Sequence, residues 1–189
     1  MLRAEDSDKT RVAEILASSF ADNKSVNYII KQDDRRGLRL RRLMEYSFNI
    51  CFLFGDVFLS EDKTACALII YPDKKKTTLK SILLDAKLAL SCMGLGNLKK
   101  AMNREAKIKK VHPEGLLCYL WFIGVFPTNQ NKGIGSQLLK DVIAEGQKQN
   151  RIICLETSTI KNIPWYEKFD FTTYKELDFG YKLYCMKRV

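Results

Sequence analysis

The chain has 189 residues, which is the usual length of one globular domain. Hydrophobic residues make up 46% of it, so a packed core can form and global disorder is excluded. The longest uncharged run, residues 115–131, becomes polar and meets Pro127 well before about 20 apolar residues, so no membrane-spanning segment and no membrane partner are expected. Lys and Arg outnumber Asp and Glu by 32 to 22, and the net charge of +10 favours anionic partners.

The positive charge gathers in three clusters, at residues 35–42, 74–76 and 99–110. Aromatic residues do not alternate with these clusters, as a stacking platform for bases would require. We therefore interpret the clusters as solvated surface and expect no specific nucleic-acid partner.

The N-terminal residues carry no apolar segment of the kind found in secretory signals, so the cytoplasm is the expected location. Six cysteines lie far apart with no C-x-x-C pair, and the single histidine, His112, cannot complete a zinc site of the usual spacing. We expect buried, reduced thiols and no metal. His112 precedes Pro113, and we expect it in a solvated loop.

In the first half, apolar spacing predicts helices over residues 9–20 and 36–48, and two short β-rich runs at 57–60 and 65–71 predict a hairpin. A third helix is expected to follow and to end at Gly94 and Gly96. Its apolar stripe is expected to pack into the core and consists of Leu79, Ile82, Leu83, Ala86, Leu90 and Met93.

The second half alternates strands with helices. A buried strand is expected over 116–126, a helix over 136–149, a second buried strand over 152–155, and a short helix opening at Pro164. Two further strands are expected at 174–179 and 181–186. This order indicates an α/β domain with a mixed sheet.

A glycine-bearing turn, residues 130–136, lies between the buried strand and the helix that follows it. Two glycines allow a ligand to approach the backbone closely, and free N–H groups at a helix start favour an anion. Lys132 adds a positive charge and Ser136 adds a hydroxyl. The turn can hold a pyrophosphate, although a tight turn that needs glycine only for its geometry has the same G-x-G pattern. It does not match the Walker loop, and Leu138 occupies the place of the third small residue of a dinucleotide fingerprint.

Val125-Phe126-Pro127 followed by Gln130-x-x-Gly133-x-Gly135 resembles the acyl-CoA-binding motif of the GNAT acetyltransferase superfamily. A second block, Leu155-Glu156-Thr157-Ser158 followed by Asn162-x-x-x-Tyr166-x-x-x-x-Phe171, resembles the branch that includes puromycin N-acetyltransferase-like proteins. The resemblance is close from about Tyr119 to Phe171. The chain departs from the family at Asp170, where glycine is usual, and at its short N-terminus, so that the first strand is expected to be short or missing.

This resemblance implies a GNAT-like acyl-CoA N-acyltransferase fold, with a mixed central sheet flanked by helices. It implies one domain over residues 1–189, with an acceptor-side half at 1–114 and an acetyl-CoA-binding half at 115–189. A helical insert, residues 79–110, would shape the acceptor pocket. The cofactor would be acetyl-CoA, and its expected binding residues are Ile123, Gly124, Val125, Gln130, Asn131, Lys132, Gly133, Ile134, Gly135, Ser136 and Asn162.

Tyr166 stands where the family places its general acid, and Glu156 is the best remaining carboxylate for a general base. A purely structural role for Glu156, or a water relay in its place, stays open. The expected function is transfer of an acetyl group to a primary amine of a small molecule by a monomer or homodimer. The alternatives are acetylation of a protein N-terminus or lysine, and a non-catalytic acyl-CoA-binding regulator.

Overall fold

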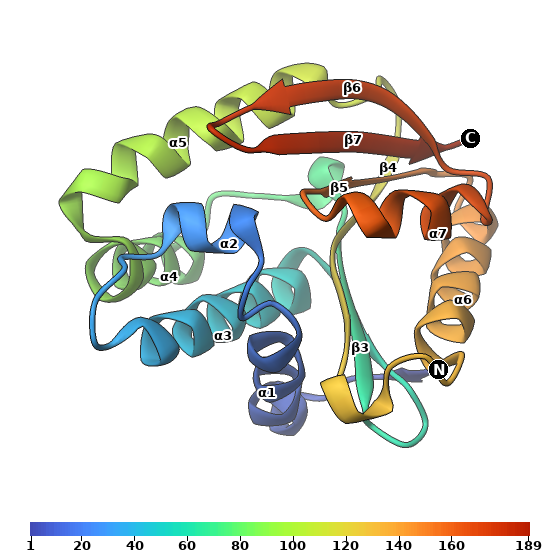
Figure 1. The fold of residues 1–189 in the computed structure, drawn as a ribbon, viewed down its shortest axis with the longest axis horizontal. Helices are drawn as coiled ribbons and strands as arrows, with labels where there is room; N and C mark the ends of the chain where they lie inside the picture. The colour runs from blue at the N-terminus through green and yellow to red at the C-terminus, as the bar shows by residue number, and fades with distance from the viewer.

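A computed structural model of the chain describes the backbone of residues 1–189 and every side chain except that of Leu95. One mixed sheet runs through the molecule in the order β1-β2-β3-β4-β5-β7-β6 (Figure 1). β4 and β5 are parallel, and the other neighbouring strands are antiparallel. The strands are β1 (Leu2–Arg3), β2 (Gly55–Leu59), β3 (Ala65–Ile70), β4 (Leu117–Val125), β5 (Ile152–Thr157), β6 (Thr172–Asp178) and β7 (Lys182–Arg188).

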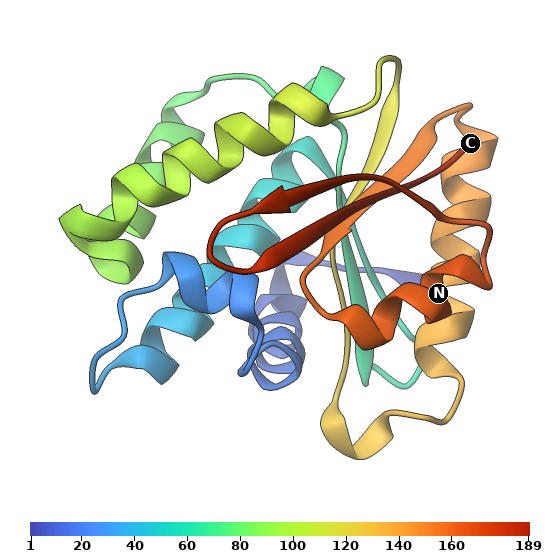
Figure 2. The same ribbon diagram turned by 45° about the horizontal axis from the view of Figure 1, so that its top comes forward.

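Helices cover both faces of the sheet (Figures 1 and 2). α1 and α3 pack on one face, where they share a core with β2, β3 and β4, and α6 packs on the other. α5 runs beside the hairpin of β6 and β7. The helices are α1 (Lys9–Ser19), α2 (Lys24–Ile29), α3 (Arg36–Phe54), α4 (Leu79–Leu88), α5 (Gly94–Val111), α6 (Ile134–Lys148) and α7 (Ile163–Glu167).

Most predicted elements are present, with shifted ends. The first strand is indeed short, because β1 has two residues, Leu2 and Arg3, that pair with Leu59 and Phe58. The helix predicted over 36–48 continues to Phe54. α2 was not predicted from the sequence. It is a short helix capped by the Asn23 side chain, which accepts a hydrogen bond from the Val26 N–H.

α3 passes into β2 without a connecting loop. Phe54 is the last helical residue and Gly55 is the first strand residue. A Cβ atom on Gly55 would lie 1.9 Å from the carbonyl oxygen of Ile69 in the neighbouring strand. This position therefore has room only for glycine, and its absent side chain lets the helix end directly against β3.

The helical insert consists of two helices and not one. A single π-helical turn, Ala89–Met93, follows α4, and Gly94 then takes a positive φ of 70° that ends this helical run. Glycine adopts this backbone conformation without the steric penalty that a Cβ brings. α5 begins at once in a new direction, so Gly96 lies inside a helix and does not terminate one.

The prediction that the apolar stripe from Leu79 to Met93 packs into the core is wrong, except at Met93, which is buried. Leu79 is 83% exposed, Leu83 is 70% exposed and Leu90 is 81% exposed. The helix packs through its opposite side, where Ser81 and Leu88 are buried. Periodicity reveals that a helix has an apolar side, but α4 has apolar residues on two sides and the less obvious one faces inward. We call the exposed set the α4 stripe: Leu79, Ile82, Leu83, Ala86 and Leu90.

Asp170 occupies the turn after α7 with a positive φ of 63°. This is the left-handed conformation that glycine adopts most readily, and Asp is among the few other residues that tolerate it. The Asp170 side chain is exposed, and its carboxylate lies 3.5 Å from the Arg188 guanidinium. The aspartate can thus form the turn in which glycine is usual in the resembling family.

We predict that Asp170→Asn and Asp170→Gly keep the melting temperature near that of the wild type, because both residues tolerate a positive φ. Asp170→Val should lower the free energy of unfolding by about 1–2 kcal/mol, because a β-branched side chain is strained there. Thermal melting followed by circular dichroism measures the difference. Equal destabilisation by Asn and Val would show that the Arg188 contact matters and the backbone does not.

Candidate active site

β4 and β5 diverge soon after they meet. Their parallel pairing covers three residue pairs, from Leu117 with Ile152 to Tyr119 with Cys154. β4 then continues to Val125 without a partner on this side, while its other edge stays paired with β3. The result is a gap in the middle of the sheet, lined by backbone groups that have no strand to bond.

The open edge of β4 presents the backbone of Ile123 and Val125. The Phe126 N–H donates to the Thr64 carbonyl on the β3 side, and successive residues of a strand point alternately, so the polar groups of Val125 point to the gap. The Val125 carbonyl accepts hydrogen bonds from Ser19 Oγ at 2.8 Å and from Gln130 Nε2 at 3.3 Å. Gly124 serves packing, because a Cβ there would lie 3.0 Å from Leu16 and 3.1 Å from Ser19 of α1.

The turn over residues 130–136 leads from the gap into α6. Asn131 and Gly133 take positive φ values of 62° and 83°. The first hydrogen bond of the helix joins the Gln137 N–H to the Gly133 carbonyl, so the N–H groups that precede it have no partner within the helix. These groups lie at the positive end of the helix dipole, which attracts an anion. Lys132 is exposed beside them.

The two glycines of this turn differ in what surrounds them. A Cβ on Gly133 would meet no described atom within 4 Å, so this position faces open space. A Cβ on Gly135 would lie 3.1 Å from Val125 and 4.0 Å from Trp165, so it would point into the protein. Gly135 therefore allows α6 to pack closely against β4. Trp165 Nε1 also donates to Ser136 Oγ at 3.0 Å, which leaves the Ser136 hydroxyl proton for another acceptor.

Two unpaired polar side chains line the gap from the β5 side. Asn162 is the N-cap residue of α7, yet its side chain makes no capping hydrogen bond and lines the cavity. Ser158 Oγ is buried and has no hydrogen-bond partner among the described residues. A buried hydroxyl without a partner is unfavourable by about 1–3 kcal/mol, so it indicates a polar ligand in the gap.

Tyr166 of α7 is buried and lines the same cavity. Its ring packs against Trp165 and Phe171, with centroid distances of 4.7 and 5.7 Å. Burial raises the pKa of the Tyr166 hydroxyl above its ordinary value, so the group stays protonated at neutral pH. It is available as a hydrogen-bond donor.

Glu156 lies on β5 with its side chain only 4% exposed. The Tyr119 hydroxyl donates to its Oε2 at 2.5 Å, and His112 Nε2 lies 3.3 Å from its Oε1. Burial, followed by the nearby Glu156 charge, raises the pKa of Tyr119, which therefore remains a donor. Side chains thus contact both carboxylate oxygens. Neither oxygen caps a backbone N–H group, which is the contact that a purely structural role would involve.

The expectation that His112 is solvated is wrong. It follows directly on α5, its side chain is 13% exposed, and its ring packs 5.0 Å from that of Tyr119. The sequence offered no signal for this, because residue 112 meets residue 156 only after α5 has folded across the end of β4. Tyr119 was likewise missed, although it opens the strand segment where the gap begins.

The far end of the cavity is closed by a polar cluster. The Arg104 guanidinium, buried on α5, donates to Ser25 Oγ at 2.6 Å and to the Tyr181 hydroxyl at 3.0 Å. Tyr28 packs 5.5 Å from Tyr181 between their ring centroids. These contacts join α2, α5 and the turn between β6 and β7, and we call them the Arg104 cluster.

Between the gap and the Arg104 cluster lies one cavity with an empty volume of about 810 Å³, including its part open to solvent. Apolar walls stand opposite Glu156 and Glu105, and they comprise Phe20, Val26, Ile29, Leu43, Trp121 and Phe122. Among the described residues, no group of three His, Cys, Asp or Glu side chains could hold a metal ion. The six cysteines are buried free thiols, as predicted.

Residues 94–173 match the family model of the acetyltransferase (GNAT) domain. The matched segment covers α5, the gap, the turn before α6, and α7. It thus contains His112, Glu156 and Tyr166 together with the turn over residues 130–136.

Solved structures extend the similarity to nearly the whole chain. A histone acetyltransferase HPA2 and related acetyltransferase from Corynebacterium glutamicum is 17% identical with a TM-score of 0.70, and the alignment covers 98% of this chain and 93% of that one. The C-terminal condensation domain of Ebony in complex with β-alanyl-dopamine is 11% identical with a TM-score of 0.68, covering 99% and 96%. Arabidopsis thaliana Naa50 in complex with the bisubstrate analogue CoA-Ac-MVNAL is 14% identical with a TM-score of 0.51, covering 98% and 95%.

These similarities confirm the predicted fold: the chain has the α/β GNAT fold, with a mixed seven-stranded sheet flanked by helices. The match to the acetyltransferase domain supports an acyltransferase enzyme. Among the described helices, none combines the length and apolar character that crossing a bilayer requires.

We predict that His112→Ala lowers the free energy of unfolding by about 1–3 kcal/mol, because Glu156 Oε1 loses its partner in a buried place. For a chain of this length, each kcal/mol lowers the melting temperature by about 2–4 °C. Lys110→Ala is the matched control, since Lys110 is exposed on the last turn of α5 and its loss should change stability by less than about 0.5 kcal/mol. Equal melting temperatures of the two variants would show that the contact between His112 and Glu156 does not contribute to stability.

Proposed function

We propose that this protein is an N-acetyltransferase that moves the acetyl group of acetyl-CoA to a primary amine of a small molecule. The observation that carries the proposal is the gap between β4 and β5, where the unpaired backbone of β4 and a protonated tyrosine line one cavity, and the anion-attracting turn follows the end of β4. The expected location is the cytoplasm. The similarity of the Leu155–Phe171 block to puromycin N-acetyltransferase-like proteins remains a prediction.

The proposed binding of acetyl-CoA uses groups that have no partner within the fold. The backbone of Ile123 and Val125 would pair with the pantetheine arm in place of a strand. Ser158 Oγ and Asn162 would bond its amide groups, since the hydroxyl is buried without a partner and the amide side chain leaves its helix uncapped. The remaining binding role is assigned to the turn over residues 130–136, whose N–H groups and Lys132 would hold the pyrophosphate.

The proposed reaction is direct acyl transfer. The nitrogen of a neutral primary amine attacks the thioester carbonyl, a C–N bond forms and the C–S bond breaks. The amine nitrogen loses one proton and the CoA sulfur gains one, so the products are an amide and a thiol. Negative charge develops on the carbonyl oxygen, and an N–H on the open edge of β4 near Val125 can stabilise it.

Tyr166 is proposed to donate a hydrogen bond or proton to the departing sulfur. Because burial raises its pKa, it holds its proton more firmly than an ordinary phenol, so hydrogen-bond stabilisation of the thiolate is the larger part of this role. Glu156, oriented by His112 and Tyr119, is proposed to accept the amine proton directly or through a water molecule.

The Arg104 cluster favours a small acceptor over a lysine within a polypeptide. Such a lysine needs a groove through which the chain continues on both sides of it, whereas a protein N-terminus needs only one opening. Here the hydrogen bonds from Arg104 to Ser25 and Tyr181 close one end of the cavity. The apolar walls favour an amine with an apolar or aromatic body, and Glu105 and Glu156 favour its cationic form on arrival. A protein acceptor and a non-catalytic regulator are the alternatives.

We predict that Lys132→Glu weakens the binding of CoA, measured by titration calorimetry, by about 10- to 30-fold. One charge reversal replaces an attraction by a repulsion, each worth about 1 kcal/mol at 4 Å in water. Lys140→Glu is the matched control, because Lys140 is exposed on α6, beyond the turn. If both variants lose affinity equally, only the net charge matters and the turn is not the pyrophosphate site.

We predict that Tyr166→Phe lowers kcat by about 10²- to 10⁴-fold while the Kd for acetyl-CoA barely changes, because the ring stays and only the hydroxyl is removed. Thiol release with a panel of primary amines measures kcat. In the wild type, a raised tyrosine pKa means that the donor remains protonated above pH 10, so Tyr166 should produce no basic limb in the pH–rate profile below that pH.

Glu156→Gln completes this comparison, because it keeps the acceptor for the Tyr119 hydroxyl and removes the basic carboxylate. It should lower kcat and flatten the acidic limb of the profile. A variant that melts earlier but turns over normally would assign Glu156 a structural role. Bound acetyl-CoA with no turnover on any amine would favour the regulator.

A further inference from the structure

Among the described residues, the α4 stripe is largely left exposed to solvent. Its members Leu79, Leu83 and Leu90 are at least 70% exposed, and Ile82 is 49% exposed. Residues on an α-helix are 100° apart, which places Leu79, Ile82, Leu83 and Ala86 on one side of α4, and Leu90 follows in the π-helical turn after that helix. Ser81 and Leu88 occupy the opposite side and pack inward. Contiguous apolar surface of this kind marks an interaction surface.

Positive charge surrounds this stripe. Lys74, Lys75 and Lys76 come directly before the helix, and Lys80 and Lys87 follow one flank of the stripe along it. All five are exposed. Over residues 74–110 the chain has eleven Lys or Arg residues and two acidic ones. One of these acids, Asp85, is already bound, because its Oδ1 accepts a hydrogen bond from the Tyr46 hydroxyl at 2.6 Å.

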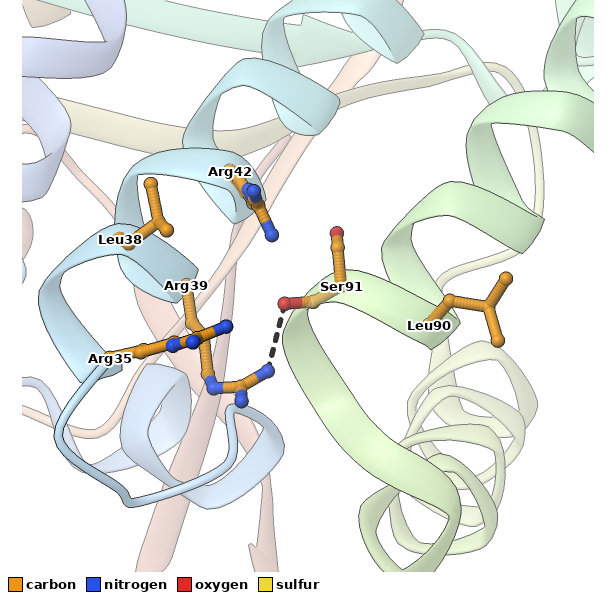
Figure 3. Close-up of a pocket in the computed structure, with 6 residues that line it drawn as sticks. All are labelled: Arg35, Leu38, Arg39, Arg42, Leu90 and Ser91. Carbon is orange, nitrogen blue, oxygen red and sulfur yellow. Dashed lines mark hydrogen bonds between the residues drawn. The ribbon is translucent and has the colours of Figure 1, made fainter.

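A cleft lined by arginines adjoins the end of the stripe. Arg35, at the N-cap of α3, and Arg39 and Arg42, within α3, face Ser91 in the π-helical turn. Leu90 also lines this cleft, but its side chain points away from the arginines (Figure 3). Arg39 is committed, since it forms two hydrogen bonds with the Asp33 carboxylate at 2.9 and 2.7 Å and one with the Ser91 carbonyl at 2.9 Å.

The other two arginines of the cleft are free to bind a ligand. Among the described residues, no carboxylate lies within 4.0 Å of the Arg35 or Arg42 side chain, and both are exposed. Hydrogen bonding from Arg39 holds the pKa of Asp33 below its ordinary value, so that carboxylate stays paired with Arg39. The cleft therefore presents two guanidinium groups beside exposed Leu38 and Leu90.

We propose that this face docks on the surface of an anionic phospholipid bilayer. The α4 stripe lies among the upper acyl chains, and Arg35, Arg42 and the flanking lysines contact headgroup phosphates. Apolar residues on one side of a helix with cations along its flank are the features of a helix that lies in a membrane interface. The protein rests on the bilayer and does not cross it. This amends the expectation of no membrane partner and is independent of the proposed function.

A second copy of the chain fits this face less well. Pairing two α4 stripes would bring the lysines of one copy beside those of the other, and like charges repel. An anionic surface turns the same charges into an attraction. Charge complementarity therefore favours the bilayer as the occupant.

Co-sedimentation with vesicles tests the proposal on the full chain. Vesicles of mixed phosphatidylglycerol and phosphatidylcholine should bind the protein, and vesicles of phosphatidylcholine alone should not. Leu83→Gln with Leu90→Gln should reduce the partition coefficient at least about tenfold, because two side chains no longer leave water. Arg35→Gln with Arg42→Gln should reduce it about 25-fold, at roughly fivefold for each charge.

Leu116→Gln is the matched control, since Leu116 is also exposed but precedes β4, away from α4. It should bind vesicles like the wild type. Because all these side chains are exposed, each variant should fold, and its melting curve verifies this. The proposal fails if mixed vesicles at low salt do not bind the protein, or if the control loses binding as much as the stripe variant. It also fails if analytical sedimentation shows that the wild type is a dimer and that the Leu83→Gln, Leu90→Gln variant is a monomer.

Discussion

The whole arrangement depends on one constraint, the parting of β4 from β5 after three residue pairs. Backbone N–H and C=O groups inside a protein need partners, and an unpaired strand edge in the middle of a sheet is unfavourable. Some of these groups are bonded within the fold, since Ser19 and Gln130 donate hydrogen bonds to the Val125 carbonyl. The groups that remain are left for a ligand with an extended, amide-bearing shape. The point at which the two strands separate determines where the turn before α6, Ser158 and Tyr166 lie.

The sequence predicted those parts of the site that are contiguous in the chain. The turn over residues 130–136 is such a part, because its glycines, its lysine and the following helix start are neighbours along the backbone. Why residue 135 is glycine could be explained only from the structure, in which a side chain at this position would meet Val125 and Trp165. His112 and Glu156 are 44 residues apart, and no local pattern relates them. The orientation of α4 was missed for another reason: an amphipathic pattern shows which residues share a side and not which side the core will take.

The helical insert serves two sides of the molecule at once. α5 directs Arg104 inward, where it links Ser25 to Tyr181 and closes the cavity, and it brings His112 to Glu156. α4 directs its leucines outward. Gly94 allows this division, because its positive φ turns the chain between the two helices. The insert thus combines the acceptor end of the cavity and an apolar outer surface in a single stretch of chain.

The direct passage from α3 into β2 makes α3 a rigid lever. Arg35 is its N-cap residue and Arg42 lies in its second turn. Its last residue precedes Gly55, which lies against the Ile69 carbonyl with no intervening loop. A loop would let the helix tilt while the sheet stayed still. Without one, a force applied to the arginine end must rotate β2 and, through its hydrogen bonds, β3. A partner that contacts the arginine end of α3 is therefore coupled, through α3 and β2, to β3, the strand next to β4.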